Sequence, residues 1–264
     1  MRLDTVCEQA MCPNIGECFS RNVATFLILG RNCTRMCSFC NIGKAQPLEP
    51  DLDEPNRVAQ AVARLGLKHV VITSVTRDDL ADGGAGIFAK TVLSIKRNSP
   101  DVTIEVLIPD FKLSQSSLKV VVESGPQIIA HNIETVPSLY QVVRQGADYL
   151  RSLDLLRIIK EASPALKTKT GLMLGLGEKE EEVTAVMEDL RSVRCDFLSI
   201  GQYLAPSQAH YPVKEYIAPE QFDYYKEKGR KLGFLHIESS PYVRSSYMAA
   251  EYLSLKGGLI NGKS

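Results

Sequence analysis

From residue 24 onward, apolar runs alternate along the chain with stretches in which apolar side chains recur at helical spacing. Six apolar runs predict buried strands at 24–30, 69–75, 103–108, 126–131, 169–176 and 197–203. The stretches between and after them predict helices at 53–65, 86–97, 113–123, 150–161, 178–191 and 219–231. A further apolar run at 234–238 is a candidate final strand.

Strands that are apolar on both faces and alternate with amphipathic helices are typical of a parallel sheet with right-handed crossovers. Six strand–helix units are fewer than the eight that close a full barrel. We therefore predict an α/β fold, a partial (β/α)6 TIM-type barrel with an N-terminal cysteine-rich segment and a C-terminal extension. We expect residues 1–264 to form a single domain made of segment 1–23, barrel 24–232 and extension 233–264.

Charge and hydropathy limit the classes of partner. Lys plus Arg and Asp plus Glu are balanced at 31 each, so the overall basic field that nucleic-acid binding favours is missing. No apolar run approaches the ~20 residues of a membrane span, and the first residues do not resemble a signal peptide. We expect a cytoplasmic protein that has neither nucleic acid nor a membrane as partner.

Three cysteines follow the first predicted strand at C-x3-C-x2-C spacing: Cys33, Cys37 and Cys40. Thiolates hold iron–sulfur clusters, and a four-iron cluster that only carries electrons takes four protein ligands. Three ligands would leave one iron open, as catalytic metal sites leave a position for substrate. Structural zinc favours a fourth ligand and paired cysteines, and a disulfide framework suits small secreted chains. Both are weaker alternatives for 264 residues with an odd count of seven cysteines.

A second group, Cys7, Cys12 and Cys18, has C-x4-C-x5-C spacing. By spacing alone these could be scattered thiols, but six of the seven cysteines fall within positions 7–40. Two groups of three suggest two clusters. Cys195, which precedes an apolar strand, is predicted to belong to the core.

Polar residues follow several predicted strands, where parallel barrels hold their chemistry. Each is either a site residue or part of a solvated loop: Thr73, Ser74, Arg77, Asp78, His131, Asn132, Glu134, Gln202 and Tyr203. His131 is the best candidate ligand among the four histidines. Gly171, Gly175 and Gly177 at one strand end indicate either a ligand lying close or a tight turn into the next helix. This stretch matches neither a P-loop nor a Rossmann fingerprint.

The C-x3-C-x-aromatic-C motif at 33–40 resembles the signature of the radical SAM (S-adenosylmethionine) superfamily. Over nearly the full length, the chain is similar to the lipoyl synthase family. The stretches that carry this resemblance are CPNIGEC at 12–18, NCTRMCSFC at 32–40, TSVTRDDL at 73–80, HNIETV at 131–136, GLMLGLGE at 171–178, IGQYL at 200–204 and RSSY at 244–247.

The resemblance implies two 4Fe-4S clusters. Cys33, Cys37 and Cys40 would hold the catalytic one, whose open iron binds SAM and whose electron cleaves it to a 5′-deoxyadenosyl radical. Cys7, Cys12, Cys18 and Ser246 would hold an auxiliary cluster that supplies sulfur. Without the resemblance, Ser246 would be expected to cap a helix that runs toward residue 255. The expected SAM-binding residues are Phe39, Thr73, Ser74, Asn132, Glu134, Gly171 and Gly175.

The implied reaction inserts two sulfur atoms, at C6 and C8, into an octanoyl chain held on a lysine of a carrier protein. The implied partners are an octanoylated lipoyl domain or glycine cleavage H protein, and a small electron-donor protein. Two alternatives remain open at this point. One is another radical SAM enzyme whose auxiliary cluster anchors substrate or relays electrons, and the other is a non-catalytic iron–sulfur or zinc protein.

Overall fold

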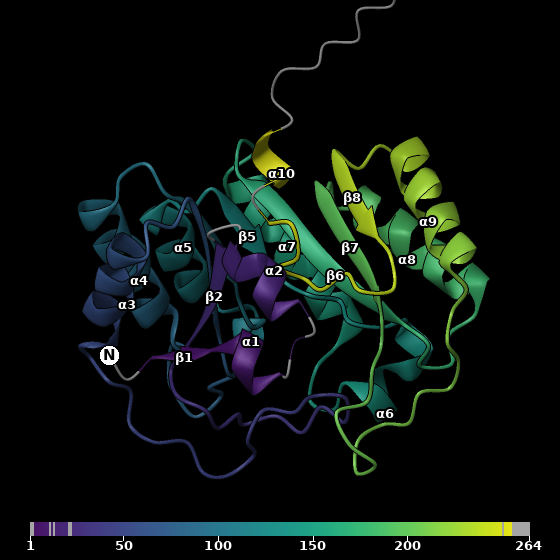
Figure 1. The fold of residues 1–264 in the computed structure, drawn as a ribbon, viewed down its shortest axis with the longest axis horizontal. Helices are drawn as coiled ribbons and strands as arrows, with labels where there is room; N and C mark the ends of the chain where they lie inside the picture. The colour runs from purple at the N-terminus through teal and green to yellow at the C-terminus, as the bar shows by residue number, and fades with distance from the viewer. Residues whose placement is uncertain (1–2, 11, 13, 21–22, 250, 255–264) are drawn as a thin grey trace, which may run out of the picture.

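The computed structural model describes residues 3–10, 12, 14–20, 23–249 and 251–254. Its centre is a sheet whose eight strands lie in chain order, β1 to β8 (Figure 1). Strands β2 to β8 are parallel, and β1 pairs antiparallel with β2. The strands are β1 (Asp4–Thr5), β2 (Val23–Ile28), β3 (His69–Ser74), β4 (Thr103–Leu107), β5 (Ile128–Ala130), β6 (Lys167–Leu174), β7 (Phe197–Gln202) and β8 (His236–Ser239).

Six long helices follow strands β2 to β7 and cover the outer side of the curved sheet (Figure 1). They are α3 (Glu54–Arg64), α4 (Ala85–Asn98), α5 (Gln115–Ser124), α7 (Tyr149–Ala162), α8 (Glu180–Ser192) and α9 (Pro219–Leu232). Shorter elements are α1 (Val6–Gln9), α2 (Ile15–Ser20), α6 (Tyr140–Val143), α10 (Glu251–Ser254) and the 3-10 turns η1 (Phe111–Leu113) and η2 (Pro137–Leu139).

This architecture confirms the predicted fold class, a partial barrel of six strand–helix units with a cysteine-rich N-terminus. The candidate strand at 234–238 exists as β8 and extends the parallel sheet by one strand beyond the six units. The two-residue strand β1 was not predicted, because two residues carry no periodicity. Among the described residues, no helix is both long enough and apolar enough to cross a membrane.

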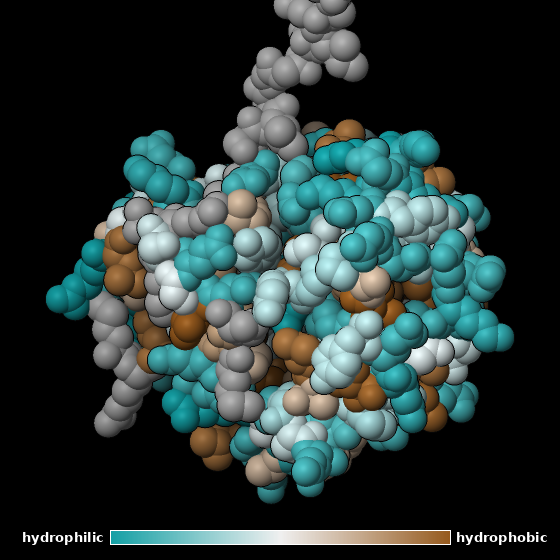
Figure 2. All heavy atoms as spheres, turned by 45° about the vertical axis from the view of Figure 1, so that its right-hand side comes forward, coloured by the Kyte–Doolittle hydropathy of each residue, from teal (hydrophilic) through white to brown (hydrophobic). Residues whose placement is uncertain are grey.

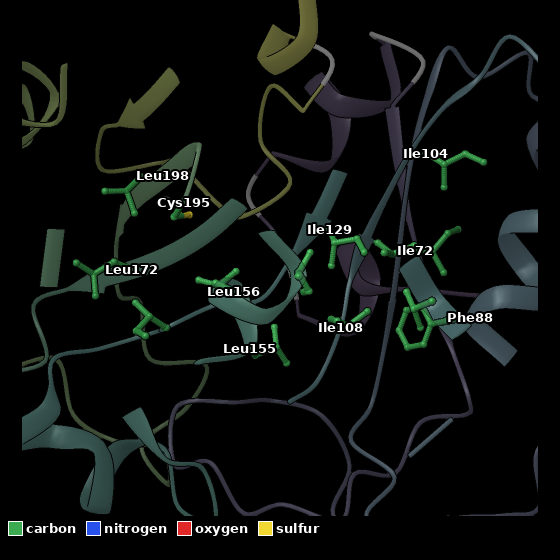
Figure 3. Close-up of a cluster of buried hydrophobic side chains, with 14 of the residues drawn as sticks. Ile72, Phe88, Ile104, Ile108, Ile129, Leu155, Leu156, Leu172, Cys195 and Leu198 are labelled. Atoms are coloured by element: carbon green, nitrogen blue, oxygen red, sulfur yellow. The ribbon is translucent and has the colours of Figure 1, made fainter. Parts of the chain in front are cut away.

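The main core lies between the sheet and its outer helices. Fully buried Ile72, Ile104 and Ile129 come from three adjacent strands, and Phe88 of α4 packs with them (Figure 3). Burying one such side chain contributes about 1.5–3 kcal/mol. Cys195, predicted as core, is fully buried there as well. This rigid layer fixes the carboxyl ends of the strands, which carry the site loops.

Candidate functional site

The loop with Cys33, Cys37 and Cys40 begins directly after β2. Gly30 has a φ of 87°, a left-handed conformation that glycine adopts without strain. Beyond this turn, Thr34 N–H donates to the Thr76 carbonyl (3.0 Å) and Ser38 N–H donates to the Val143 carbonyl (3.0 Å). The loop is therefore fastened to the carboxyl end of β3 and to α6.

Arg35, between the first two cysteines of the loop, forms a buried ion network. Its guanidinium donates to Asp110 (2.6 and 2.9 Å) and to Asp78 (2.8 and 3.1 Å), and Arg151 also contacts Asp110 (2.8 Å). Burial alone would raise the pKa of Asp110, but the hydrogen bonds and charge of Arg35 outweigh it and hold that pKa well below its usual range. Sequence analysis did not single out Arg35 or Asp110.

The thiols of this loop lie in a partly enclosed, hydrogen-bonded environment. Cys33 Sγ accepts bonds from the backbone N–H groups of Arg35 (3.4 Å) and Thr76 (3.3 Å). Burial raises the pKa of the Cys40 thiol to about 11 and raises that of Cys37, although the charge of Arg144 opposes the latter shift. Hydrogen bonds to sulfur and limited solvent exposure are two of the features that set the potential of an iron–sulfur cluster.

Both cysteine groups border one cavity of about 520 Å³ inside the barrel. Its lining includes Cys40 from the loop and Cys7, Cys12, Cys18 and Ser246 from the two ends of the chain. The cavity is also lined by six of the seven expected SAM-binding residues: Phe39, Thr73, Ser74, Asn132, Glu134 and Gly171. In Figure 2, apolar side chains lie around a recess in the middle of the face shown.

Two polar atoms of the described lining are buried without a hydrogen-bond partner in the protein. Ser74 Oγ and Asn132 Oδ1 have none, while Asn132 Nδ2 donates to Glu134 (3.0 Å). Buried polar atoms are nearly always satisfied, so these two are suited to a polar ligand. A Cβ on Gly171 would lie 2.9 Å from Asn132 Oδ1, so glycine keeps this space open. Burial raises the pKa of Glu134 against the opposing charge of Arg144.

Gly175, the seventh expected SAM-binding residue, is not among the residues that line the cavity. Its φ is 92°, and a Cβ there would collide with the Glu215 carbonyl. Its N–H donates to Glu178 (2.6 Å). The close approach at this position comes from Gln202 and Glu215, in β7 and the chain that follows it, while the bond to Glu178 belongs to the turn that leads into α8.

The other polar residues at the strand ends hold loops in place. Arg77 is buried and donates to Asp79 and to the Leu29 carbonyl, and the Tyr203 hydroxyl donates to the Tyr211 carbonyl (2.7 Å). His131, the preferred histidine, contacts the Ile108 carbonyl (2.8 Å) and does not line the cavity. Burial and then the charge of Arg144 lower the pKa of His131 to about 3, so this ring is neutral at ordinary pH.

In the second cysteine group, Cys7 lies on α1, Cys18 on α2 and Cys12 in the connection between them, and both helices pack against β2. Thr5 caps α1 by accepting from the Glu8 N–H (3.3 Å), and Cys7 on this helix is buried, with its pKa raised by burial. Asn14 donates to the Tyr242 carbonyl (2.7 Å), which ties this segment to the C-terminal segment that carries Ser246.

The donor sets suit four-iron clusters better than a single metal ion. None of the seven cysteines, all of which the structure describes, takes part in a disulfide bond. Among the described residues, no three His, Cys, Asp or Glu side chains converge on a position for one ion. The thiolates of a four-iron cluster each bind a different iron, so they surround the cluster and do not meet at one point. Two groups of three thiols, one lining the cavity with all its members and the other reaching it through Cys40, fit this chemistry.

The chain matches the family model of the radical SAM superfamily over residues 27–190. It is 61% identical over 252 residues to lipoyl synthase of Geobacter metallireducens, which covers 96% of this chain and 89% of that protein. Lipoyl synthase of Geobacter sulfurreducens is 62% identical, with coverage of 96% and 83%. Lipoyl synthase of Caldanaerobacter subterraneus is 57% identical, with coverage of 98% and 90%.

Solved structures support the fold. Streptococcus suis SuiB bound to S-adenosylmethionine aligns with a TM-score of 0.64 at 12% identity, over 93% of this chain and 57% of that one. HydG, a maturase of the [FeFe]-hydrogenase, aligns with a TM-score of 0.58 at 14% identity, over 90% and 65%. At these identities the likeness concerns the fold alone.

Proposed function

This chain belongs to the lipoyl synthase family of radical SAM enzymes, and from that premise we propose how its two cysteine groups divide the work. The enzyme inserts sulfur into a protein-bound octanoyl chain and uses 4Fe-4S clusters and SAM. C6 and C8 of that chain are unactivated carbons, which no acid or base of this cavity makes reactive. When bound, the cluster and SAM supply a 5′-deoxyadenosyl radical able to abstract hydrogen from them.

We assign Cys33, Cys37 and Cys40 to the catalytic cluster that binds SAM. In this assignment the N–H groups of Arg35 and Thr76 stabilise the Cys33 thiolate, because a hydrogen bond to the charged form favours it. The ion network of Arg35 keeps the loop in one geometry, with Cys40 in the wall of the cavity.

We assign SAM to the polar side of the cavity. Ser74 Oγ and Asn132 Oδ1 are available for hydrogen bonds there, and the open space over Gly171 lets a ligand approach the strand. Phe39 offers an aromatic face, and Thr73 and Glu134 complete the polar wall. Gly175 acts indirectly, since its turn sets the end of β6.

We assign Cys7, Cys12, Cys18 and Ser246 to the auxiliary cluster, which supplies both sulfur atoms. The observation that carries this proposal is the single cavity bordered by both cysteine groups and by Ser246. A sulfur source must reach the same carbon chain as the radical, and one shared cavity satisfies this requirement. A serine oxygen is a harder ligand than thiolate, so the iron it binds is the one most easily released.

The substrate is an octanoylated lipoyl carrier protein. We propose that a lipoyl domain or a glycine cleavage H protein presents the octanoyl-lysine at the cavity, and that a small electron-donor protein reduces the catalytic cluster. The balanced net charge of the chain argues against nucleic acid as a further partner.

The test begins with anaerobic reconstitution and counting of iron and sulfide, for which we expect about eight of each per chain. Incubation with SAM, reductant and an octanoyl-lysyl peptide should yield a product with two added sulfur atoms by mass spectrometry. Cys37→Ala should abolish 5′-deoxyadenosine formation but retain about four irons.

Ser246→Ala should still cleave SAM but produce 5′-deoxyadenosine in excess of lipoyl product. An active preparation with only four irons, or normal lipoyl yield from Ser246→Ala, would contradict the assignment.

A further inference from the structure

A buried polar cluster lies inside the barrel at the amino ends of the strands, opposite the cysteine loop. Lys169 of β6 and Glu105 of β4 form an ion pair (3.1 Å) in which each side chain is 1% exposed. The ring of Tyr252, on α10, covers the ammonium group of Lys169 at 3.9 Å from Nζ to the ring centroid. The Tyr252 hydroxyl is 2.7 Å from Ser199 Oγ of β7.

Tyr252 has further aromatic neighbours from two strands. Its ring packs edge-on against Phe197 (5.2 Å between centroids) and His236 (4.6 Å). The side chain is thus held by β6, β7 and β8 together and is only 3% exposed. A four-residue helix such as α10 is not stable by itself in water, so its position depends on such tertiary contacts.

The chain that leads to Tyr252 runs along the inside of the barrel. Near the carboxyl end of β7, the Pro241 carbonyl accepts from the Gln202 N–H (3.2 Å). Further along, Ala249 is fully buried beside Val23 and Val71, close to the amino ends of β2 and β3. In Figure 1 this yellow segment leaves β8, crosses toward α2 and reaches α10 at the top of the view.

Between these two ends, the segment contacts the second cysteine group. Asn14 bonds the Tyr242 carbonyl (2.7 Å), and the Tyr247 hydroxyl contacts the Glu17 carboxylate (3.3 Å). Ser246 lies between these contacts in the chain and lines the cavity together with Cys7, Cys12 and Cys18. Tyr252 itself does not line the cavity, so any effect it has on the cysteines passes through the segment.

We propose that Tyr252 is a positioning residue whose anchoring at the floor of the barrel holds Ser246 and the α1–α2 segment in place for the auxiliary cluster. This inference rests on the proposed role of Ser246. The ring and the hydroxyl of Tyr252 contribute differently to this anchoring. The ring covers the buried ammonium group of Lys169, whereas the hydroxyl forms a hydrogen bond with Ser199 of β7. Loss of the ring leaves the Lys169 ammonium less enclosed and frees the end of the segment.

The first measurement is alkylation of Cys7, Cys12 and Cys18 in the reduced, cluster-free full chain, followed by mass spectrometry. Tyr252→Leu should speed their modification by at least about tenfold, since the local opening that exposes them becomes more frequent. Tyr252→Phe keeps the ring and should stay within about threefold of the parent chain. Tyr225→Leu is the matched control, because Tyr225 on α9 is also 3% exposed but lies on the outer layer.

The second measurement is iron content after reconstitution. Tyr252→Leu should fall from about eight to about four irons per chain and keep SAM cleavage, while Tyr252→Phe and Tyr225→Leu should keep about eight. Unchanged alkylation and iron content in Tyr252→Leu would overturn the proposal, as would equal effects of Tyr252→Leu and Tyr225→Leu. A parent chain with only four irons would refute the auxiliary cluster, and the alkylation comparison would still decide whether Tyr252 anchors the segment.

Discussion

At the scale of single residues, the catalytic loop depends on a charge network as well as on its thiols. Arg35 reaches two carboxylates, Asp78 and Asp110, which lie 43 and 75 positions further along the chain. Asp110 is fully buried, so its charge is stabilised by Arg35 and Arg151 in place of water. Removing one member of such a buried network leaves the others without compensation.

We therefore expect Asp110→Ala to lower the free energy of unfolding by about 3–5 kcal/mol, because it leaves a buried guanidinium unpaired. Denaturant unfolding followed by circular dichroism measures this change. Asp154→Ala is the control, since Asp154 pairs with Arg157 at the surface, where ion pairs contribute little. Equal losses in the two variants would contradict the stabilising role of the Asp110 network.

The same network predicts a dependence of stability on pH. The pKa of Asp110 in the folded state is below the unfolded value of about 3.9, so its contribution is complete above that pH and is lost as pH falls toward the folded pKa. The free energy of unfolding of the parent chain should thus decrease below about pH 4. Asp110→Asn should show a smaller decrease over this range, and an identical slope would exclude Asp110 as a source of acid sensitivity.

The sequence identified the thiols of the loop but not this network. Cysteine spacing is a local pattern that can be recognised in the sequence without knowing the fold. Arg35 stands between two cysteines and could equally have been a solvated charge, because its partners come close only through the order of β3 and β4. Likewise, nothing local distinguishes His131, which is buried and neutral, from a histidine that faces the cavity.

At the scale of elements, the long helices were predicted to within two residues at each end. The helical spacing of apolar residues, such as Val58 and Val62, extends over several turns of a long helix. In α3 both of these side chains are buried. The helices α1 and α2 were not predicted, since four and six residues hold too few periods. The C-terminal extension was expected to supply a serine, but its course inside the barrel depends on contacts such as that between Asn14 and Tyr242, which are 228 positions apart.

Gly201 of β7 allows the C-terminal segment to pass through the inside of the barrel. A Cβ on Gly201 would collide with the Val243 carbonyl, which belongs to the C-terminal segment. Gly201→Ala should therefore displace the segment and lower the free energy of unfolding by about 1–3 kcal/mol, as overpacking does. Iron content after reconstitution should also decrease, because Ser246 moves with the segment.

Gly16→Ala is the control for this change, since a Cβ on Gly16 in α2 meets nothing within 4 Å. We expect that variant to keep the stability and the iron content of the parent chain. If Gly201→Ala also keeps the stability and the iron content of the parent chain, the C-terminal segment can accommodate a Cβ at position 201. That outcome would contradict the prediction.

At the scale of the whole molecule, the sheet and its helices share one main core that extends from β2 to β8. Residues of both halves belong to it, among them Ile72 and Phe88 in the first half and Leu198 and Ile237 in the second (Figure 3 labels the first three). The expectation that residues 1–264 form a single domain remains a prediction. Because the two halves share this core, we expect them to unfold together.

Cys195 provides a probe of that prediction. It is fully buried in the second half of the barrel, and burial raises the pKa of its thiol to about 12. Because the thiolate is the reactive form, alkylation near pH 8 should be very slow while the barrel is folded. In the reduced, cluster-free chain we expect partly buried Cys12 and Cys18 to be modified first.

Modification of Cys195 should begin only in the denaturant range where circular dichroism reports loss of the helices. Both signals should follow one transition, because opening the second half exposes the core of the first. Mass spectrometry of peptides after pulsed alkylation resolves each cysteine, and full denaturation gives the reference for complete modification. Modification of Cys195 well below the main transition would mean that the second half of the barrel opens by itself, which would contradict a single cooperative domain.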